Sequence, residues 1–205
     1  MPAPPRLPFD PIVEARRQWE RHGWGDVATA MAAVTSIMRM QQVLLARADA
    51  ILRPLDLTFA RYEVLMLLTF SRKGALPLGK IGQRLQVNPA SVTNAVDRLE
   101  RSRLVERVPN PADGRGTLAR LSPAGRRAAA RATRSMNAEL FGDLGLDGDD
   151  LERLFGLLQA LRQAAGDFDV EGGGTRPAAA RARPIAARTR AAGPGPGTPR
   201  RRPPR

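Results

Sequence analysis

The sequence contains no cysteine and a single histidine, His22. Without thiols, the chain cannot form a disulfide framework, a thiol-based redox switch, a cysteine-ligated zinc or iron–sulfur site, or a catalytic cysteine. One histidine cannot build a multi-histidine metal site within one chain, and no carboxylate cluster has the spacing of a metal-binding loop. We therefore expect no metal and no cofactor. For His22, a pH-dependent role and an exposed linker position both stay open.

Long apolar runs are also missing, since none approaches the ~20 residues that a membrane span requires. The proline-rich N-terminus has no apolar segment and does not resemble a signal peptide. We therefore expect a cytoplasmic protein that does not associate with a membrane. Acidic residues are few, with 20 Asp and Glu against 33 Lys and Arg and a formal charge of +13. Such a basic balance favours binding to phosphates.

Composition divides the chain into three segments. Residues 1–25 form an N-terminal arm that is rich in proline and carries a short helix, expected over 12–22. Residues 26–168 have helical periodicity and form the folded domain. Residues 169–205 are rich in Arg, Pro, Gly and Ala without periodicity, so we expect disorder there. From residue 171 onward, nine arginines and one glutamate supply +8 of the formal charge. This tail either attracts nucleic acid or keeps the protein in solution.

Capping signals and apolar spacing predict the elements of the central segment. A long helix over 26–53, capped by Asp26, exceeds what a small domain needs, so part of its apolar face meets another surface, most simply a second copy of the chain. The further predicted elements are helices over 59–70 (capped by Thr58), 78–85, 89–101 and 123–141, strands over 104–109 and 117–121 joined by a loop over 110–116, and a last helix capped by Asp149 or Asp150.

The stretch Leu78–Leu121 carries the most information. It predicts two short helices joined by a tight turn, followed by a β-hairpin with a basic tip. This order is that of a winged helix-turn-helix, whose second helix fits the major groove of DNA. The predicted fold class is therefore mainly α with a small β-wing, flanked by long N- and C-terminal helices.

The helix that begins at Pro89 carries short polar side chains opposite an apolar stripe. Hydroxyl and amide groups of this size approach base edges, and an asparagine can bind adenine through two hydrogen bonds. A solvated amphipathic helix would show the same pattern, but the neighbouring helix and hairpin favour DNA recognition. The expected DNA contacts are Ser91, Thr93, Asn94 and Arg98 on this helix, with Asp97 beside them, Lys80, Gln83 and Arg84 at the DNA backbone, and Asp113 and Arg115 in the wing, where Arg115 enters a minor groove.

Two stretches of the sequence, LTFARYEVLMLL and LGKIGQRLQVNPASVTNAVDRLERSRLVERVPNPADGRGTLARLSPAG, resemble the MarR family of bacterial transcription regulators. The resemblance extends from about Val27 to Leu161. It implies a homodimer held by the first and last helices, a pseudo-palindromic operator in double-stranded DNA, and release by a small aromatic or phenolic acid. The urate-responsive branch is expected to have Asp and Arg where this chain has Glu63 and Ala95, and the peroxide-sensing branch needs cysteine.

The same resemblance implies a small-molecule pocket between the dimer helices and the winged domain. Its candidate residues are Met38 and Arg39 on the first long helix and Tyr62 and Met66 on the next. Arg39 would pair with a carboxylate, and Tyr62 would stack on a ring and donate a hydrogen bond. Ordinary core packing of Tyr62 and Met66, and an ion pair of Arg39 between subunits, are the alternatives.

Two classes of function stay open at this point. The first is a homodimeric repressor that a small aromatic or anionic ligand releases from DNA. The second is a ligand-independent, architectural DNA-binding protein whose basic tail helps to coat DNA. An enzyme is not expected, because the sequence offers no nucleophile–base pair, no glycine-rich phosphate loop and no metal cluster.

Overall fold

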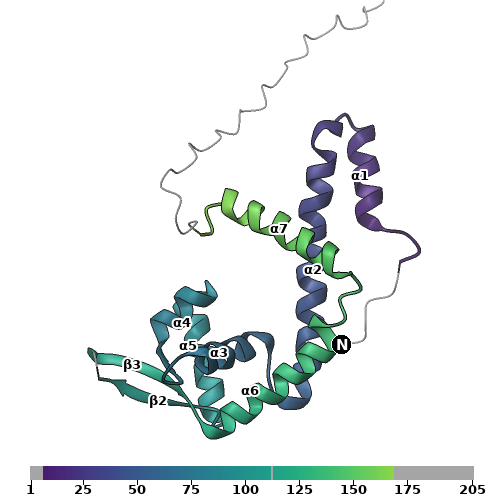
Figure 1. The fold of residues 1–205 in the computed structure, drawn as a ribbon. Helices are drawn as coiled ribbons and strands as arrows, with labels where there is room; N and C mark the ends of the chain where they lie inside the picture. Colours follow the sequence, from purple (N-terminus) through teal and green to yellow (C-terminus); the bar gives the residue numbers. More distant parts are fainter. Residues whose placement is uncertain (1–6, 112, 169–205) are drawn as a thin grey trace, which may run out of the picture. The chain divides into compact units, whose positions relative to one another are not determined.

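The computed structural model of the protein describes residues 7–111 and 113–168, with the side chains of 113–115 left out. The fold is mostly helical with one small antiparallel sheet, which confirms the predicted fold class (Figure 1). Among the described residues, no helix combines the length and apolarity needed to cross a bilayer. The elements are α1 (Pro11–Arg21), α2 (Gly25–Leu52), a 3-10 turn (Arg53–Leu55), α3 (Phe59–Phe70), β1 (Ala75–Pro77), α4 (Leu78–Leu85), α5 (Pro89–Arg101), β2 (Val105–Asn110), β3 (Asp113–Leu121), α6 (Pro123–Met136), a π-helical turn (Asn137–Phe141) and α7 (Gly148–Ala164).

Three predicted helix starts are confirmed by side-chain caps. The side chains of Thr58, Asn88 and Ser122 each accept a hydrogen bond from the backbone N–H three residues further on. A proline follows Asn88 and Ser122 at the first helical position, where its missing N–H costs nothing. Because these signals are local, α3, α5 and α6 begin at the predicted positions. α4 also has its predicted bounds, although no side chain caps its start.

Two predicted caps are wrong. Asp26 lies inside the first turn of α2, whose N-cap position makes no side-chain hydrogen bond. α7 is capped by Asp147, whose carboxylate accepts the N–H of Asp150 at 2.8 Å. Asp149 and Asp150 instead occupy the first helical turn. Negative charge is favourable at that end of the helix dipole, so all three aspartates suit the start of α7 but only the first has the extended backbone of a cap.

The core of the winged unit brings together apolar side chains from every element between α2 and α6. Complete burial of one such side chain contributes about 1.5–3 kcal/mol, so this cluster holds the wing and the helices as one body. The members that are at most 2% exposed are Ala48, Leu52, Val64, Leu65, Leu68, Ile81, Val92, Val96, Leu99, Val105, Ala119, Ala129, Ala132 and Met136.

The wing differs from its prediction in length. β3 is the central strand, in the order β1-β3-β2, and it pairs with both neighbours in antiparallel register. The predicted loop over 110–116 is largely strand, because an irregularity between Pro109 and Asn110 allows pairing to resume at Asn110 and Asp113. The sequence did not predict β1, a three-residue strand that exists only by pairing with residues 118–120 of β3.

Helix α1 packs along α2, and aromatic rings cover the turn between them. The Trp19 and Trp24 rings meet edge to face with centroids 5.3 Å apart, and the His22 ring stacks on Trp24 at 5.8 Å. His22 lies exposed at the C-cap of α1, where its Nδ1 is 2.7 Å from the carbonyl oxygen of Gln18. The position of His22 agrees with the second expectation, that of an exposed residue in a linker.

Helix α7 belongs to a separate compact unit that begins at Asp147 and is described by itself. It has no buried residue along its 17 positions. The apolar side chains at helical spacing are all exposed or half-buried: Leu151, Leu154, Phe155, Leu158 and Leu161.

Replacing Gly125 with alanine tests the packing of α6 against the base of the wing. A Cβ there would lie 2.1 Å from the Leu104 carbonyl oxygen and 2.8 Å from Leu121 Cδ1. We expect Gly125→Ala to lower the free energy of unfolding by about 1–3 kcal/mol, as measured by denaturant titration. Gly79→Ala, in α4 with open space around the new methyl group, is the control and should stabilise by at most ~1 kcal/mol. Equal stabilities of the two variants would contradict the described packing.

Candidate nucleic-acid interface

The turn between α4 and α5 is tight and fixed by the backbone. Gln86 ends α4 in the left-handed conformation, at a φ of 55°, and the Val87 N–H donates to the Gly82 carbonyl oxygen at 3.1 Å. A Cβ at Gly82 would lie 3.2 Å from Val87 O and 3.3 Å from Val92 Cγ2. The absence of a side chain at Gly82 therefore lets the two helices approach closely, which sets the angle at which α5 is presented.

Helix α5 has two opposite faces. Val92, Val96 and Leu99 are at most 2% exposed and anchor the helix in the core. On the outward side, all four predicted recognition residues are exposed: Ser91, Thr93, Asn94 and Arg98. The structure thus places the predicted set together on one face, over about two helical turns.

Hydrogen bonds within α5 leave part of this face free for bases. The Thr93 hydroxyl donates to the Pro89 carbonyl oxygen at 3.0 Å. Arg98 Nε approaches the Asn94 side-chain oxygen at 3.4 Å, a long contact that is easily exchanged for another. The Asn94 amide can therefore offer both a donor and an acceptor to a base edge.

The residues predicted to hold the DNA backbone lie on α4. Lys80, Gln83 and Arg84 are all exposed, and in the part of the chain that the structure describes none of them has an ion pair. In the wing, the backbones of Asp113 and Arg115 belong to β3, but their side chains lie outside the described residues. Their predicted contacts stay predictions.

Sequence reasoning missed an ion-pair cluster between α5 and the wing. Arg107 Nη1, on β2, lies 2.5 Å from Asp97 Oδ1 and 2.8 Å from Glu100 Oε2. Burial lowers the pKa of Arg107, but hydrogen bonds to Asp97 and Glu100 outweigh it, so the pKa is raised overall. Asp97 is therefore engaged by the wing and is not a free part of the recognition face. The signal in the sequence was a pair of acids, Asp97 and Glu100, three residues apart on a helix that is predicted to contact DNA.

The four candidate pocket residues form two separate pairs. Tyr62 is buried, with its hydroxyl 3.2 Å from Thr133 Oγ1, and the Thr133 hydroxyl also contacts Met66 Sδ. Met38 is exposed on α2, where Arg39 donates to the side chain of Gln42. Within the described residues, no hydrogen bond or ring contact joins the two pairs. Core packing therefore accounts for Tyr62 and Met66 in a single chain.

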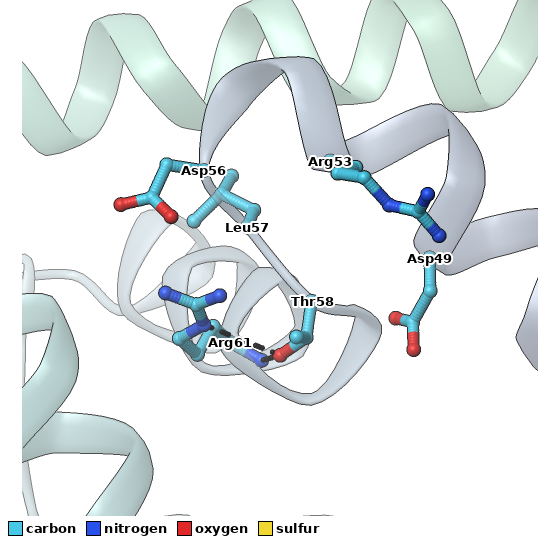
Figure 2. Close-up of a pocket in the computed structure, with 6 residues that line it drawn as sticks. All are labelled: Asp49, Arg53, Asp56, Leu57, Thr58 and Arg61. Atoms are coloured by element: carbon cyan, nitrogen blue, oxygen red, sulfur yellow. Dashed lines mark hydrogen bonds between the residues drawn. The ribbon is translucent and has the colours of Figure 1, made fainter. Parts of the chain in front are cut away.

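A hollow of about 210 Å³ lies where α2 meets α3, and its lining residues differ from the four candidate pocket residues (Figure 2). Arg53 and Asp49 lie on one side and Arg61 and Asp56 on the other, so the formal charges cancel. Asp49 also accepts the backbone N–H of Phe59 at 2.7 Å. This balance gives the hollow no net attraction for an anion. None of the candidate pocket residues lines it.

Together, the fixed α4–α5 turn, the outward polar face of α5 and the paired wing define a winged-helix, DNA-binding transcription regulator. Residues 55–116 match the model of the MarR family. The chain is 54% identical to Sco5413, a MarR family transcriptional regulator from Streptomyces coelicolor; the match covers 69% of this chain and 99% of that one, with a TM-score of 0.64. The chain belongs to the MarR family, whose members are transcription regulators and not enzymes.

Two further relatives extend the comparison. A mutant of MarR from E. coli, solved in complex with operator DNA, is 26% identical over 66% of this chain and 96% of that one, with a TM-score of 0.60. YhbI of Bacillus subtilis, described as an uncharacterized HTH-type transcriptional regulator, is 32% identical over 77 residues, or 38% of this chain. The match spans about half of YhbI, at 49% of its length.

Replacing Glu63 tests a half-buried charge on α3. Burial raises the pKa of Glu63 above its ordinary value of 4.5, and in the described part of the chain its carboxylate has no partner. The raised pKa stabilises the fold when Glu63 is protonated, and this contribution is lost as the pH rises through the folded-state pKa.

We therefore expect Glu63→Gln to raise the free energy of unfolding at pH 7, and the difference from the parent protein to shrink as the pH falls towards 4.5. Denaturant titrations across this range measure both effects. Glu152→Gln, at an exposed position of α7, gives the effect of losing one surface charge. A Glu63→Gln variant that is less stable at pH 7 would contradict an unpaired, half-buried carboxylate.

Proposed function

We propose that the protein is a homodimeric repressor that binds a specific operator and leaves it when a small aromatic or anionic ligand binds. The observation that carries the proposal is the outward polar face of α5, held by the buried stripe of Val92, Val96 and Leu99. This helix is rigidly placed, and its small side chains suit base edges. On this proposal it acts in the cytoplasm, in contact with the genome.

Unpaired apolar faces support the dimer. The apolar side of α2 that buries Ala48 and Leu52 continues towards the N-terminus as Val34, Ile37 and Met38, which are exposed. Helix α7 separately exposes apolar side chains at helical spacing. Large exposed apolar surfaces indicate an interaction site, and a second copy of the chain would cover both helices in one symmetric assembly.

Two-fold symmetry would place two α5 helices in successive major grooves, about 34 Å apart on one side of the duplex. The operator would then be pseudo-palindromic, with the Arg115 wings at the flanking minor grooves. The structure of the E. coli MarR mutant in complex with operator DNA supports operator DNA as the partner of this chain.

Ligand release would act through the spacing of the two winged units. The ligand would bind best to a dimer whose two winged units are spaced differently from those of the DNA-bound dimer. Such a ligand shifts the population away from the DNA-bound state. On this proposal Arg39 pairs with the carboxylate and Met38 contacts the ring, while Tyr62 exchanges its hydrogen bond to Thr133 for one to the ligand. Met66 lines the same pocket beside Tyr62.

A ligand-independent architectural protein is the second candidate, favoured by the +8 charge of residues 171–205. Titration of small aromatic acids against a dimer–operator complex separates the two. Loss of DNA binding supports the repressor, and affinity unchanged by every acid supports the architectural protein. Selection of duplexes from a random pool, with sedimentation to measure mass, tests the shared claim of a dimer with a preferred site.

Replacing Asn94 with alanine tests base recognition. Because its amide can bind one base through two hydrogen bonds, Asn94→Ala should cost about 1–3 kcal/mol on the selected operator and relax discrimination at one base pair. Lys80→Ala is the contrasting control, since loss of a phosphate contact should weaken binding to operator and random duplex alike. Fluorescence anisotropy on both duplexes measures these effects. Equal losses of Asn94→Ala on the two duplexes would count against base recognition.

A further inference from the structure

We infer that Arg107 is a positioning residue that couples the wing to the recognition helix and thereby sets discrimination between operator and other DNA. It contacts no base in this account and acts through Asp97 and Glu100 of α5. The inference rests on the proposed sequence-specific binding. It assigns a role in that binding to a residue that lies outside both the recognition helix and the wing tip.

Three bonds join β2 to α5 at this point. Glu100 Oε1 accepts the backbone N–H of Arg107 at 3.1 Å, while its Oε2 receives Arg107 Nη1 at 2.8 Å. The same Nη1 lies 2.5 Å from Asp97 Oδ1. Because both main chain and side chain are held, the bonds fix the direction of β2 as well as its distance from α5.

Because of the position of Arg107 along the hairpin, these bonds control where the wing tip lies. Arg107 pairs with Ala119, and β2 continues for three more residues to Asn110. The end of β2 therefore lies roughly 10 Å beyond the bonds that join Arg107 to α5. A small rotation at Arg107 would displace the wing tip from the minor groove while leaving the buried stripe of α5 in place.

The cluster also controls charge. Asp97 and Glu100 lie in the second half of α5, where negative charge is unfavourable to the helix dipole and would repel nearby phosphates. Arg107 lies between them with 29% of its side chain exposed, so it partly neutralises both carboxylates. Its loss would therefore both free the wing and expose two negative charges.

The wing contains a matched control in Arg120. Arg120 Nη2 lies 2.9 Å from Glu106 Oε2, which is an ion pair of similar length in the same hairpin. This pair joins β3 to β2 and does not reach α5, and both side chains are about half exposed, at 52% and 54%. Arg120→Ala removes the same charge from the wing without releasing it from the recognition helix.

The experiment measures binding of the full chain to the selected operator and to random duplex for four variants. They are Arg107→Ala, Arg107→Lys, Arg120→Ala, and Arg107→Ala combined with Asp97→Asn and Glu100→Gln. Arg120→Ala should weaken binding to both duplexes by a similar factor. Arg107→Ala should lower operator affinity about tenfold more than Arg120→Ala does, and should lower the operator-to-random ratio.

The combined variant separates geometry from charge. It lacks the carboxylates that the loss of Arg107 would leave unpaired on α5, so its affinity for random duplex should return to at least the level of Arg120→Ala, while its operator-to-random ratio stays low. Arg107→Lys keeps the charge but lacks the planar, forked donor, so it should recover random binding better than discrimination. Thermal unfolding of each variant shows that it is folded, and Arg107→Lys carries the test if Arg107→Ala is not.

Equal operator-to-random ratios for Arg107→Ala and Arg120→Ala would overturn the positioning role. Full recovery of the ratio in the combined variant would also overturn it, since charge alone would then explain the effect. A parent protein without preference for any duplex would instead refute the proposed function, so the two failures are distinguishable.

Discussion

The whole interface depends on the burial of one stripe on α5. Val92, Val96 and Leu99 have almost no exposure, and a close approach at Gly82 brings α4 against the same helix. Since the stripe faces the core, the polar residues between its members must face outward. Small side chains are thereby held on a rigid helix, which is what discrimination between base pairs requires. Loss of this anchoring would leave the same side chains on a mobile helix with no defined register on DNA.

Electrostatics adds a second level of organisation around this helix. Exposed cationic residues on α4 have no acidic partner among the described residues, whereas the acids on the second half of α5 are paired with Arg107 of the wing. The arrangement leaves the positive charges of α4 available to phosphates. It also neutralises part of the negative charge on α5 that would repel them. A DNA-binding protein gains affinity from both effects, because phosphate contacts dominate the free energy of association. The wing is thus part of the charge pattern of the recognition helix as well as its structural neighbour.

Local signals account for what the sequence predicted well. Asn88 followed by Pro89, and Ser122 followed by Pro123, mark helix starts through bonds within three residues, and the exposed face of α5 follows from helical period alone. Features that require distant pairing were missed. β1 is too short to recognise without β3, and the Arg107 cluster joins residues from a helix and a strand. The candidate pocket combines Met38 on α2 with Tyr62 on α3. The spacing of the sequence could not predict that the Tyr62 hydroxyl forms a partly buried hydrogen bond with Thr133.

Hydroxyl-radical footprinting of the protein on its selected operator tests the central claim most directly. If α5 of each subunit enters a major groove with its polar face inward, protected sugars should form a two-fold symmetric pattern on one side of the duplex. The two centres of protection should lie about one helical turn apart, roughly 34 Å along the axis. A single protected segment without symmetry, or uniform weak protection along any duplex, would contradict the account.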